Sequence, residues 1–221
     1  MVGAERRGRM GWMRGRRRSV LVLVWGGVLA VIAGAGFGIA AWQGVFAEER
    51  GDIAASDVCS NVPDRAKTAE ALRSVLPKES TYSFEETLLP RKNDHFTSLC
   101  TVYGNDDKAL LRLRALPRGG VPWDEWWSHA LFGLKRDGLE PYRAGERAWA
   151  GSRAVVIGIP CWPAEAPGEA VRDLAVSVQA SEPLDTGSGN ARKVLLTLAT
   201  DFARQAHKDA RCDLPARLPG G

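Results

Sequence analysis

The chain of 221 residues is poor in the side chains from which metal and catalytic sites are most often built, with three histidines and four cysteines. Successive cysteines are 41, 61 and 51 positions apart, so none has the short paired spacing of zinc ligands. The sequence also contains no Gly-x-Ser-x-Gly, His-Glu-x-x-His or phosphate-loop motif. We therefore expect no metal and no cofactor, and no catalytic residue can be named.

Charge is absent from residues 19–47, directly after a segment in which seven of 18 residues are arginine. The most apolar part, residues 20–42, has 23 residues. As a helix it would be roughly 34 Å long, enough to cross a hydrocarbon core of about 30 Å. The positive-inside rule then predicts a basic cytoplasmic tail (1–18), a transmembrane helix (19–42) and a single-pass topology in the cell membrane, with the C-terminal domain extracellular.

A cleaved export signal is the alternative to an uncleaved anchor. Val45-Phe46-Ala47 offers small enough residues for a signal peptidase before Glu48, and Arg17-Arg18 loosely match a twin-arginine signal. Such signals usually carry about 7 to 15 apolar residues, fewer than this run contains. The length therefore favours the anchor.

The net charge of +4 divides unevenly along the chain. Residues 1–18 hold seven arginines and one glutamate, a charge of +6, whereas residues 19–221 hold 23 basic and 25 acidic side chains, a charge of −2. A nucleic-acid-binding domain would present a basic face, so we expect no nucleic-acid partner. The tail is expected to contact anionic membrane lipid.

Beyond the predicted anchor we expect a tether (43–58), a folded domain (59–212) and a disordered tail (213–221). Periodicity predicts a helix over 62–76, a hairpin of strands 99–103 and 108–116, strands over 155–161 and 174–180, and a final helix ending at Cys212. A further helix is predicted to begin at Pro122. This order indicates an α+β fold, an antiparallel sheet covered on one face by about three helices.

All four cysteines follow the predicted anchor, which places them in an oxidising compartment and predicts two disulfides. Cys59 precedes the first domain helix and Cys212 ends the last one, while Cys100 and Cys161 lie in predicted strands. We favour Cys59–Cys212 with Cys100–Cys161, and the other two pairings stay open.

Several of these features together resemble a family. An arginine-rich tail before a single anchor, four widely spaced cysteines, and an ending that runs from Ala191-Arg192-Lys193 to Arg211-Cys212 are similar to uncharacterised actinobacterial single-pass membrane or secreted proteins with a four-cysteine extracytoplasmic domain. The excess of arginine, 23 against seven lysines, fits their high-GC genomes. The resemblance implies a cell-envelope setting and supplies no activity or site residues.

Two hypotheses for function follow. The first is a non-catalytic envelope module that binds a protein or glycan, with Trp123 and Trp127 as a possible binding surface, since exposed aromatic side chains bind such partners well. Packing in the core is the other role open to these tryptophans. The sequence does not give the oligomeric state.

The second hypothesis is an envelope hydrolase that uses a histidine and a carboxylate. Its candidate groups are Asp94 with His95, Glu125 with His129 at helical i, i+4 spacing, and Asp201 with His207. None of these pairs comes with a third residue that would complete a recognisable site.

Overall fold

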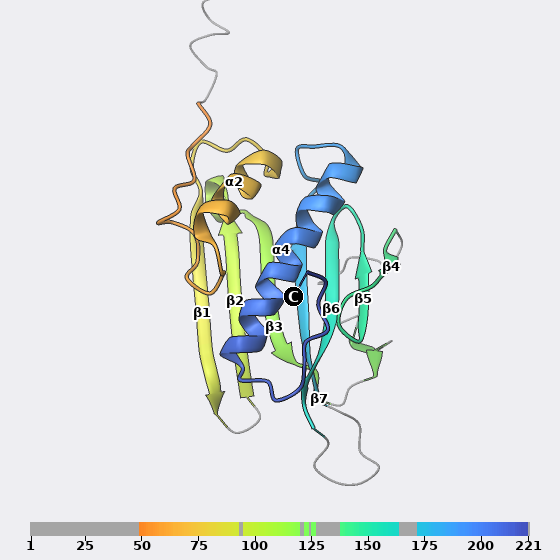
Figure 1. Cartoon of the computed structure of the whole chain (residues 1–221). Helices are drawn as coiled ribbons and strands as arrows, with labels where there is room; N and C mark the ends of the chain where they lie inside the picture. Colours follow the sequence, from red (N-terminus) through yellow and green to blue (C-terminus); the bar gives the residue numbers. More distant parts are fainter. Residues whose placement is uncertain are drawn as a thin grey trace, which may run out of the picture. The chain divides into compact units, whose positions relative to one another are not determined.

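Strands of alternating apolar and polar residues form a sheet of seven antiparallel strands. The structure is a computed structural model, and it describes residues 49–92, 95–119, 122–123, 125–126, 138–163 and 172–220. The strands lie side by side in the order β1-β2-β3-β7-β6-β5-β4 (Figure 1). Their bounds are β1 Ser83–Lys92, β2 His95–Tyr103, β3 Ala109–Pro117, β4 Glu140–Tyr142, β5 Arg147–Ala150, β6 Ala154–Trp162 and β7 Arg172–Ala180. Two meanders, β1 to β3 and β4 to β7, therefore meet where β3 pairs with β7.

Two helices, α2 (Arg65–Val75) and α4 (Ser188–Asp209), lie on one face of this sheet (Figure 1). The α+β class is thus confirmed. The first helix starts later than predicted, at Arg65 rather than at residue 62, because the Asp64 side chain caps it by accepting a hydrogen bond from the Lys67 backbone N–H. Neither helix is both long and apolar enough to cross a bilayer, and the predicted span at 19–42 lies outside the described residues.

Helix α4 supplies the largest part of the helical layer. Its apolar residues recur at intervals of three and four, and Leu195, Ala199, Phe202 and Ala206 are completely buried. They meet the apolar side chains of the central strands, among them Ile157 on β6 and Val176 on β7, which are also completely buried. The main core therefore lies between α4 and the middle of the sheet.

The opposite face of the sheet is also covered where β6 and β7 run. Successive side chains of a strand point to opposite faces, yet every residue of β6 is buried. Val156 and Ala175 form a second core cluster with Trp123, apart from the main core. The expectation that helices cover only one face is thus wrong, because the segment begun at Pro122 places its first tryptophan on the other one.

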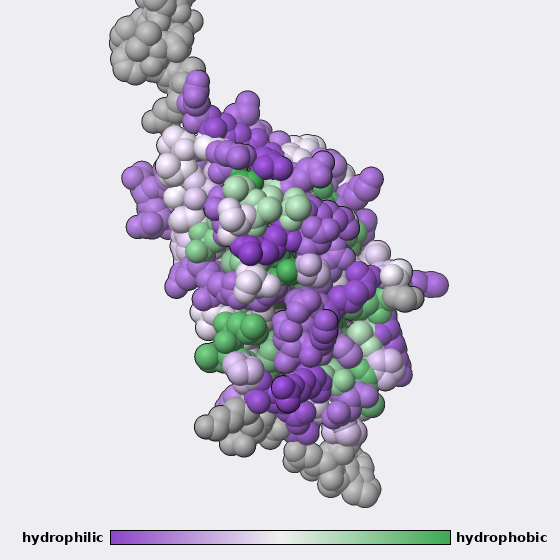
Figure 2. Space-filling model, turned by 60° about the vertical axis from the view of Figure 1, so that its left-hand side comes forward, coloured by the Kyte–Doolittle hydropathy of each residue, from purple (hydrophilic) through white to green (hydrophobic). Residues whose placement is uncertain are grey.

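The predicted hairpin is present as β2 and β3, joined by a short 3-10 turn at Asn105–Asp107. Strand β1 adds to its outer side and forms one edge of the sheet. Figure 2 brings this side forward and shows a mainly hydrophilic surface with hydrophobic patches. Leu88 and Leu89 of β1 are the large apolar side chains exposed in the described part of the chain, and Pro90 follows them.

The folded domain begins earlier than the sequence predicted, at Glu49 rather than Cys59. Ile53 and Val58, expected in a free tether, are buried in the main core. The Gly51 backbone N–H also donates to the Glu79 carbonyl over 2.8 Å. Buried apolar side chains and hydrogen bonds therefore hold this segment on the domain.

The C-terminal residues 213–220 are ordered against the domain, so the prediction of a disordered tail is wrong. The Asp213 N–H donates to the Cys161 carbonyl, and Gly145 N–H donates to the Arg217 carbonyl. Ala216 and Leu218 pack against the main core. Residues 213–220 form a segment without helix or strand, which we call the C-terminal strap.

The two disulfides form, but they join Cys59 to Cys100 and Cys161 to Cys212, so the pairing favoured above is wrong. The reason is the strand order. Cys100 on β2 and Cys161 on β6 are separated by β3 and β7, roughly 14 Å at ordinary strand spacing, beyond the reach of a disulfide.

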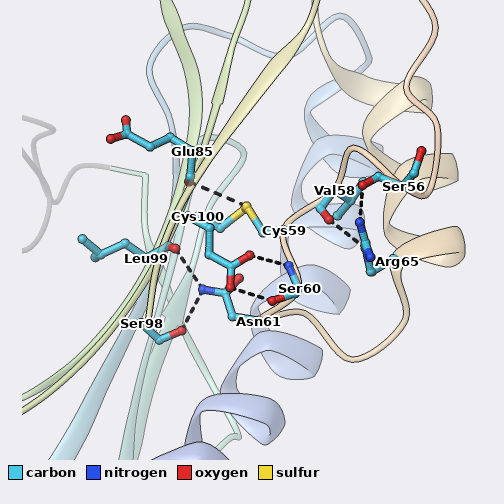
Figure 3. The surroundings of a disulfide bond; sticks show 11 residues. Ser56, Val58, Cys59, Ser60, Asn61, Arg65, Glu85, Ser98, Leu99 and Cys100 are labelled. Carbon is cyan, nitrogen blue, oxygen red and sulfur yellow. Dashed lines mark hydrogen bonds between the residues drawn. A yellow bond between two sulfur atoms is a disulfide. The ribbon is translucent and has the colours of Figure 1, made fainter. Parts of the chain in front are cut away.

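Hydrogen bonds around Cys59 hold its segment close to Cys100 (Figure 3). The Asn61 side-chain amide donates to the Ser98 hydroxyl and the Leu99 carbonyl of β2, at 3.0 and 2.9 Å. The Ser60 N–H and hydroxyl both donate to the Glu86 carboxylate on β1. These bonds hold the segment before α2 over the two strands, directly above Cys100.

We predict that Cys100→Ser lowers the free energy of unfolding by about 2 to 4 kcal/mol. The chain-entropy model gives about 4 kcal/mol for a loop of this length, and measured losses are often smaller. Urea unfolding of the variant measures the loss. Alkylation under denaturing, non-reducing conditions should find Cys59 as the single free thiol, whereas a free Cys161 would contradict the pairing.

We predict that Gly158→Ala destabilises the domain by about 1 to 3 kcal/mol, as overpacking of a filled core does. A Cβ atom at this position would lie 2.2 Å from the Trp123 ring. The matched control is Gly189→Ala on α4, where nothing lies within 4 Å and alanine is the better helix former. Urea unfolding followed by tryptophan fluorescence should separate the two, and equal midpoints would contradict the packing described.

Candidate binding groove

A hollow of about 310 Å³ lies beside helix α4, on its side away from the core. We call it the α4 groove. Its walls combine the outer side of α4 with one residue from β4 and one from the C-terminal strap: Lys193, Leu196, Thr197, Thr200 and Asp201, with Tyr142 and Pro219.

The spacing on α4 explains why these side chains meet. Lys193, Leu196, Thr197, Thr200 and Asp201 follow one another at i, i+3, i+4, i+7 and i+8, which places them along one stripe of the helix. The apolar stripe that fills the core is on the other side. The helix is therefore held rigidly by its buried face while its polar stripe lines the groove.

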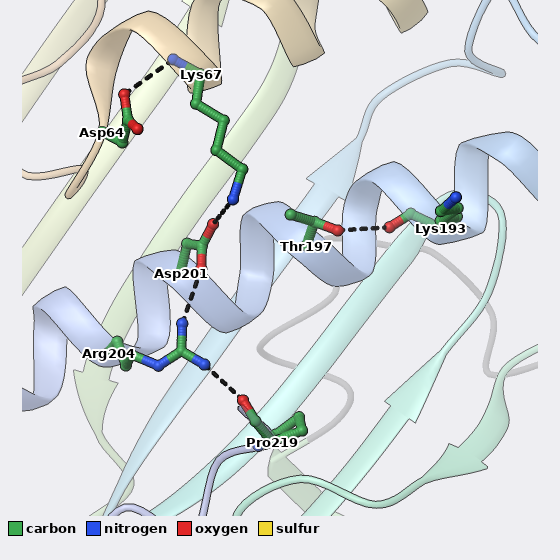
Figure 4. A network of polar contacts seen from close by, with 7 residues as sticks. All are labelled: Asp64, Lys67, Lys193, Thr197, Asp201, Arg204 and Pro219. Atoms are coloured by element: carbon green, nitrogen blue, oxygen red, sulfur yellow. Dashed lines mark hydrogen bonds and ion pairs between the residues drawn. The ribbon is translucent and has the colours of Figure 1, made fainter. Parts of the chain in front are cut away.

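A charge network closes one end of the groove (Figure 4). Lys67 of α2 donates to Asp201 Oδ2 over 3.3 Å, and Arg204 Nη1 donates to Asp201 Oδ1 over 2.9 Å. The other guanidinium nitrogen of Arg204 donates to the Pro219 carbonyl. The network thus links both helices to the strap and fixes the position of the Asp201 carboxylate.

Other polar groups of the groove do not take part in such a network of hydrogen bonds and ion pairs. The Lys193 ammonium, the Tyr142 hydroxyl and the Thr200 hydroxyl make no hydrogen bond or ion pair with the residues that the structure describes. The Thr197 hydroxyl donates to the Lys193 carbonyl, which leaves its oxygen able to accept. The groove therefore offers one cation, several hydroxyls and one fixed carboxylate to a ligand.

The acid-base pairs expected from the sequence are not assembled in the described residues. His207 Nε2 donates to the Leu214 carbonyl over 2.7 Å, while Asp201 is held by Lys67 and Arg204, so these two candidates have separate structural roles. Asp94 and His129 lie outside the described residues, although His95 and Glu125 are described and exposed. Within that part of the chain no cluster of metal-ligating side chains occurs either.

The binding surface proposed for Trp123 and Trp127 can be followed only in part. Trp123 is 8% exposed, and its ring packs edge-on to Trp126 with the centroids 5.3 Å apart. Trp127 lies outside the described residues, so the pairing stays a prediction. Core packing is the role that Trp123 has here.

A buried ion pair anchors this tryptophan cluster. The Arg118 guanidinium donates to Asp173 Oδ2, at 2.9 Å from Nη2, and lies 4.9 Å from the centre of the Trp123 ring. The side chain of Asp173 is 2% exposed, and its Oδ1 has no hydrogen-bond partner among the residues that the structure describes. Burial, with a smaller contribution from the negative charge of Glu146, raises the pKa of Asp173 despite the attraction of Arg118.

Perturbed carboxyl groups often mark active sites, but this one has a structural explanation. Its charged partner Arg118 stacks on the core residue Trp123, and the second carboxylate near it, Glu146, contributes less to the raised pKa than burial does. We interpret Asp173 as the anchor of the Arg118 side chain.

The α4 groove was not predicted from the sequence, although the helical stripe that forms one of its walls can be recognised there. The polar stripe from Lys193 to Asp201 is visible as a helical pattern. The remaining walls, Tyr142 and Pro219, come from segments whose approach to α4 depends on the strand order and on the strap. No local sequence pattern predicts the strand order or the path of the C-terminal strap.

The site and fold together define a disulfide-bonded α+β domain with a polar groove. A scan against protein-family models and searches of curated proteins and of solved structures found no match to this chain.

We predict that wild-type protein loses stability relative to Asp173→Asn as the pH rises from acid to neutral. A raised folded-state pKa means that the protonated carboxyl contributes stability below its ordinary value of 3.8, and that this contribution is lost as the pH rises through the raised value. Asparagine keeps the shape without titrating. Urea unfolding of both proteins over this range measures the difference, and parallel curves would contradict the raised pKa.

Proposed function

We propose that this chain is a non-catalytic, membrane-anchored binding domain displayed on the outer side of the cell membrane, with the α4 groove as its ligand site. The observation that carries the proposal is the groove itself, whose side chains present hydrogen-bonding groups and charge without a paired nucleophile and base. Ligand sites orient their ligands with a few placed polar groups on a largely preformed wall.

The two disulfides support the outer location. Both lie within the unit that begins at Glu49, and disulfides persist in oxidising compartments. The apolar run before this unit is long enough to anchor it.

The early start of the domain shortens the predicted tether. Only residues 43–48 separate the predicted span from Glu49. Six residues can extend over at most about 20 Å. Such a link suits a binding domain that works at the membrane surface.

The alternative of an envelope hydrolase is favoured by no observation on the described residues. His207 and Asp201 have separate partners, and the other two pairs are only partly described.

We predict that the full chain sediments with the membrane, retains residues 1–18 and carries both disulfides after its thiols are trapped in intact cells. Val31→Arg, near the centre of the apolar run, should weaken membrane retention, because an arginine there costs about 2.5 to 3.5 kcal/mol. Met10→Arg adds the same charge to the basic tail and is the matched control.

Fractionation, peptide mapping and N-terminal sequencing measure these outcomes. A soluble extracellular chain that begins at Glu48 would contradict the anchor. Four free thiols would contradict the outer location.

A further inference from the structure

We propose that the α4 groove binds a sugar that carries a carboxylate, such as a uronic acid; this inference rests on the proposed binding function and names the chemistry of its ligand. The groove has three properties that together select this class. They are its local charge, its hydroxyl partners and its shape.

The local charge is positive, opposite to that of the domain. Lys67, Lys193 and Arg204 supply three cations at or beside the groove, against the carboxylate of Asp201, and Glu140 of β4 is already paired with Arg192. Residues 19–221 as a whole carry a net charge of −2. An anion is therefore attracted to this face more than to the domain on average.

The anion has one favourable position. Lys193 is exposed and makes no ion pair with the described residues, so it can bind a ligand carboxylate. At the other end, Lys67 and Arg204 already neutralise Asp201. A ligand with one negative charge matches the single unpaired cation of the lining, whereas the second charge of a phosphate would have no unpaired cation among the lining residues.

The body of the ligand is expected to carry hydroxyl groups. Each Asp201 oxygen accepts one hydrogen bond from the protein and keeps a lone pair for a second donor. Thr197 can accept and Thr200 can donate or accept. A polyol satisfies such a mixed set, whereas a purely apolar ligand would leave these groups without partners in a closed interface.

The shape agrees with one or two sugar rings. Lys193 and Asp201 are eight positions apart on α4, a rise of roughly 12 Å. The hollow of about 310 Å³ is at the small end of ligand sites. Leu196 and the Tyr142 ring give its wall an apolar component against which the C–H face of a sugar ring can pack.

The test is calorimetric titration of the full chain, in a detergent without a sugar headgroup, with D-glucuronate, D-glucose, acetate and inorganic phosphate. We expect glucuronate to bind more tightly than the other three, because only it has both the carboxylate and the hydroxyls. Lys193→Gln should weaken glucuronate binding about tenfold, the usual effect of losing a charge-assisted hydrogen bond. Lys208→Gln, an exposed lysine of α4 outside the groove, is the matched control and should change nothing.

A second variant tests the hydroxyl partners. Thr200→Val keeps the side-chain shape and should weaken glucuronate binding while leaving the binding of acetate unchanged. The melting temperature of each variant shows that it is folded.

Three results would overturn the proposal: no glucuronate binding to folded protein at tens of millimolar, equal binding of acetate or phosphate, or equal effects of Lys193→Gln and Lys208→Gln. These results leave the membrane and disulfide measurements unaffected. Failure of the ligand class and failure of the proposed location are therefore distinguishable.

Discussion

The burial of one face of helix α4 against the sheet is the interaction on which the rest of the structure depends. Its completely buried side chains, Leu195 and Phe202 among them, fill the space above the central strands. The same helix holds α2 through Asp201 and the C-terminal strap through Arg204. A shift of α4 would move all five groove residues that the helix carries, so the apolar face that stabilises the fold also fixes the positions of the polar stripe.

The disulfides reinforce the two ends of this arrangement. Cys59–Cys100 ties the segment before α2 to β2, and Cys161–Cys212 ties the end of α4 to β6. Each bridge joins a terminal segment to a strand that is already fixed by its neighbours. The disulfides therefore keep the segments before α2 and after α4 in contact with the sheet.

Periodicity and turn residues were sufficient to predict the elements near the centre of the domain. The hairpin of β2 and β3, the strands β6 and β7, and helix α4 were each visible because apolar residues recur at the period of their structure. Features that depend on how the elements lie beside one another were not predicted correctly. The disulfide pairing needed the strand order, and the groove needed the approach of Tyr142 and Pro219 to α4. The burial of Ile53 and the order of residues 213–220 depended on contacts too far away in the sequence to be read locally.

The early start of the folded domain determines which residues can be removed without disturbing its core. A proteolytic cut within residues 43–48 removes no side chain of the described core, whereas a cut after Val58 would remove two of its completely or almost completely buried members, Ile53 and Val58. The unit that begins at Glu49 therefore contains the whole described core, both disulfides and the α4 groove.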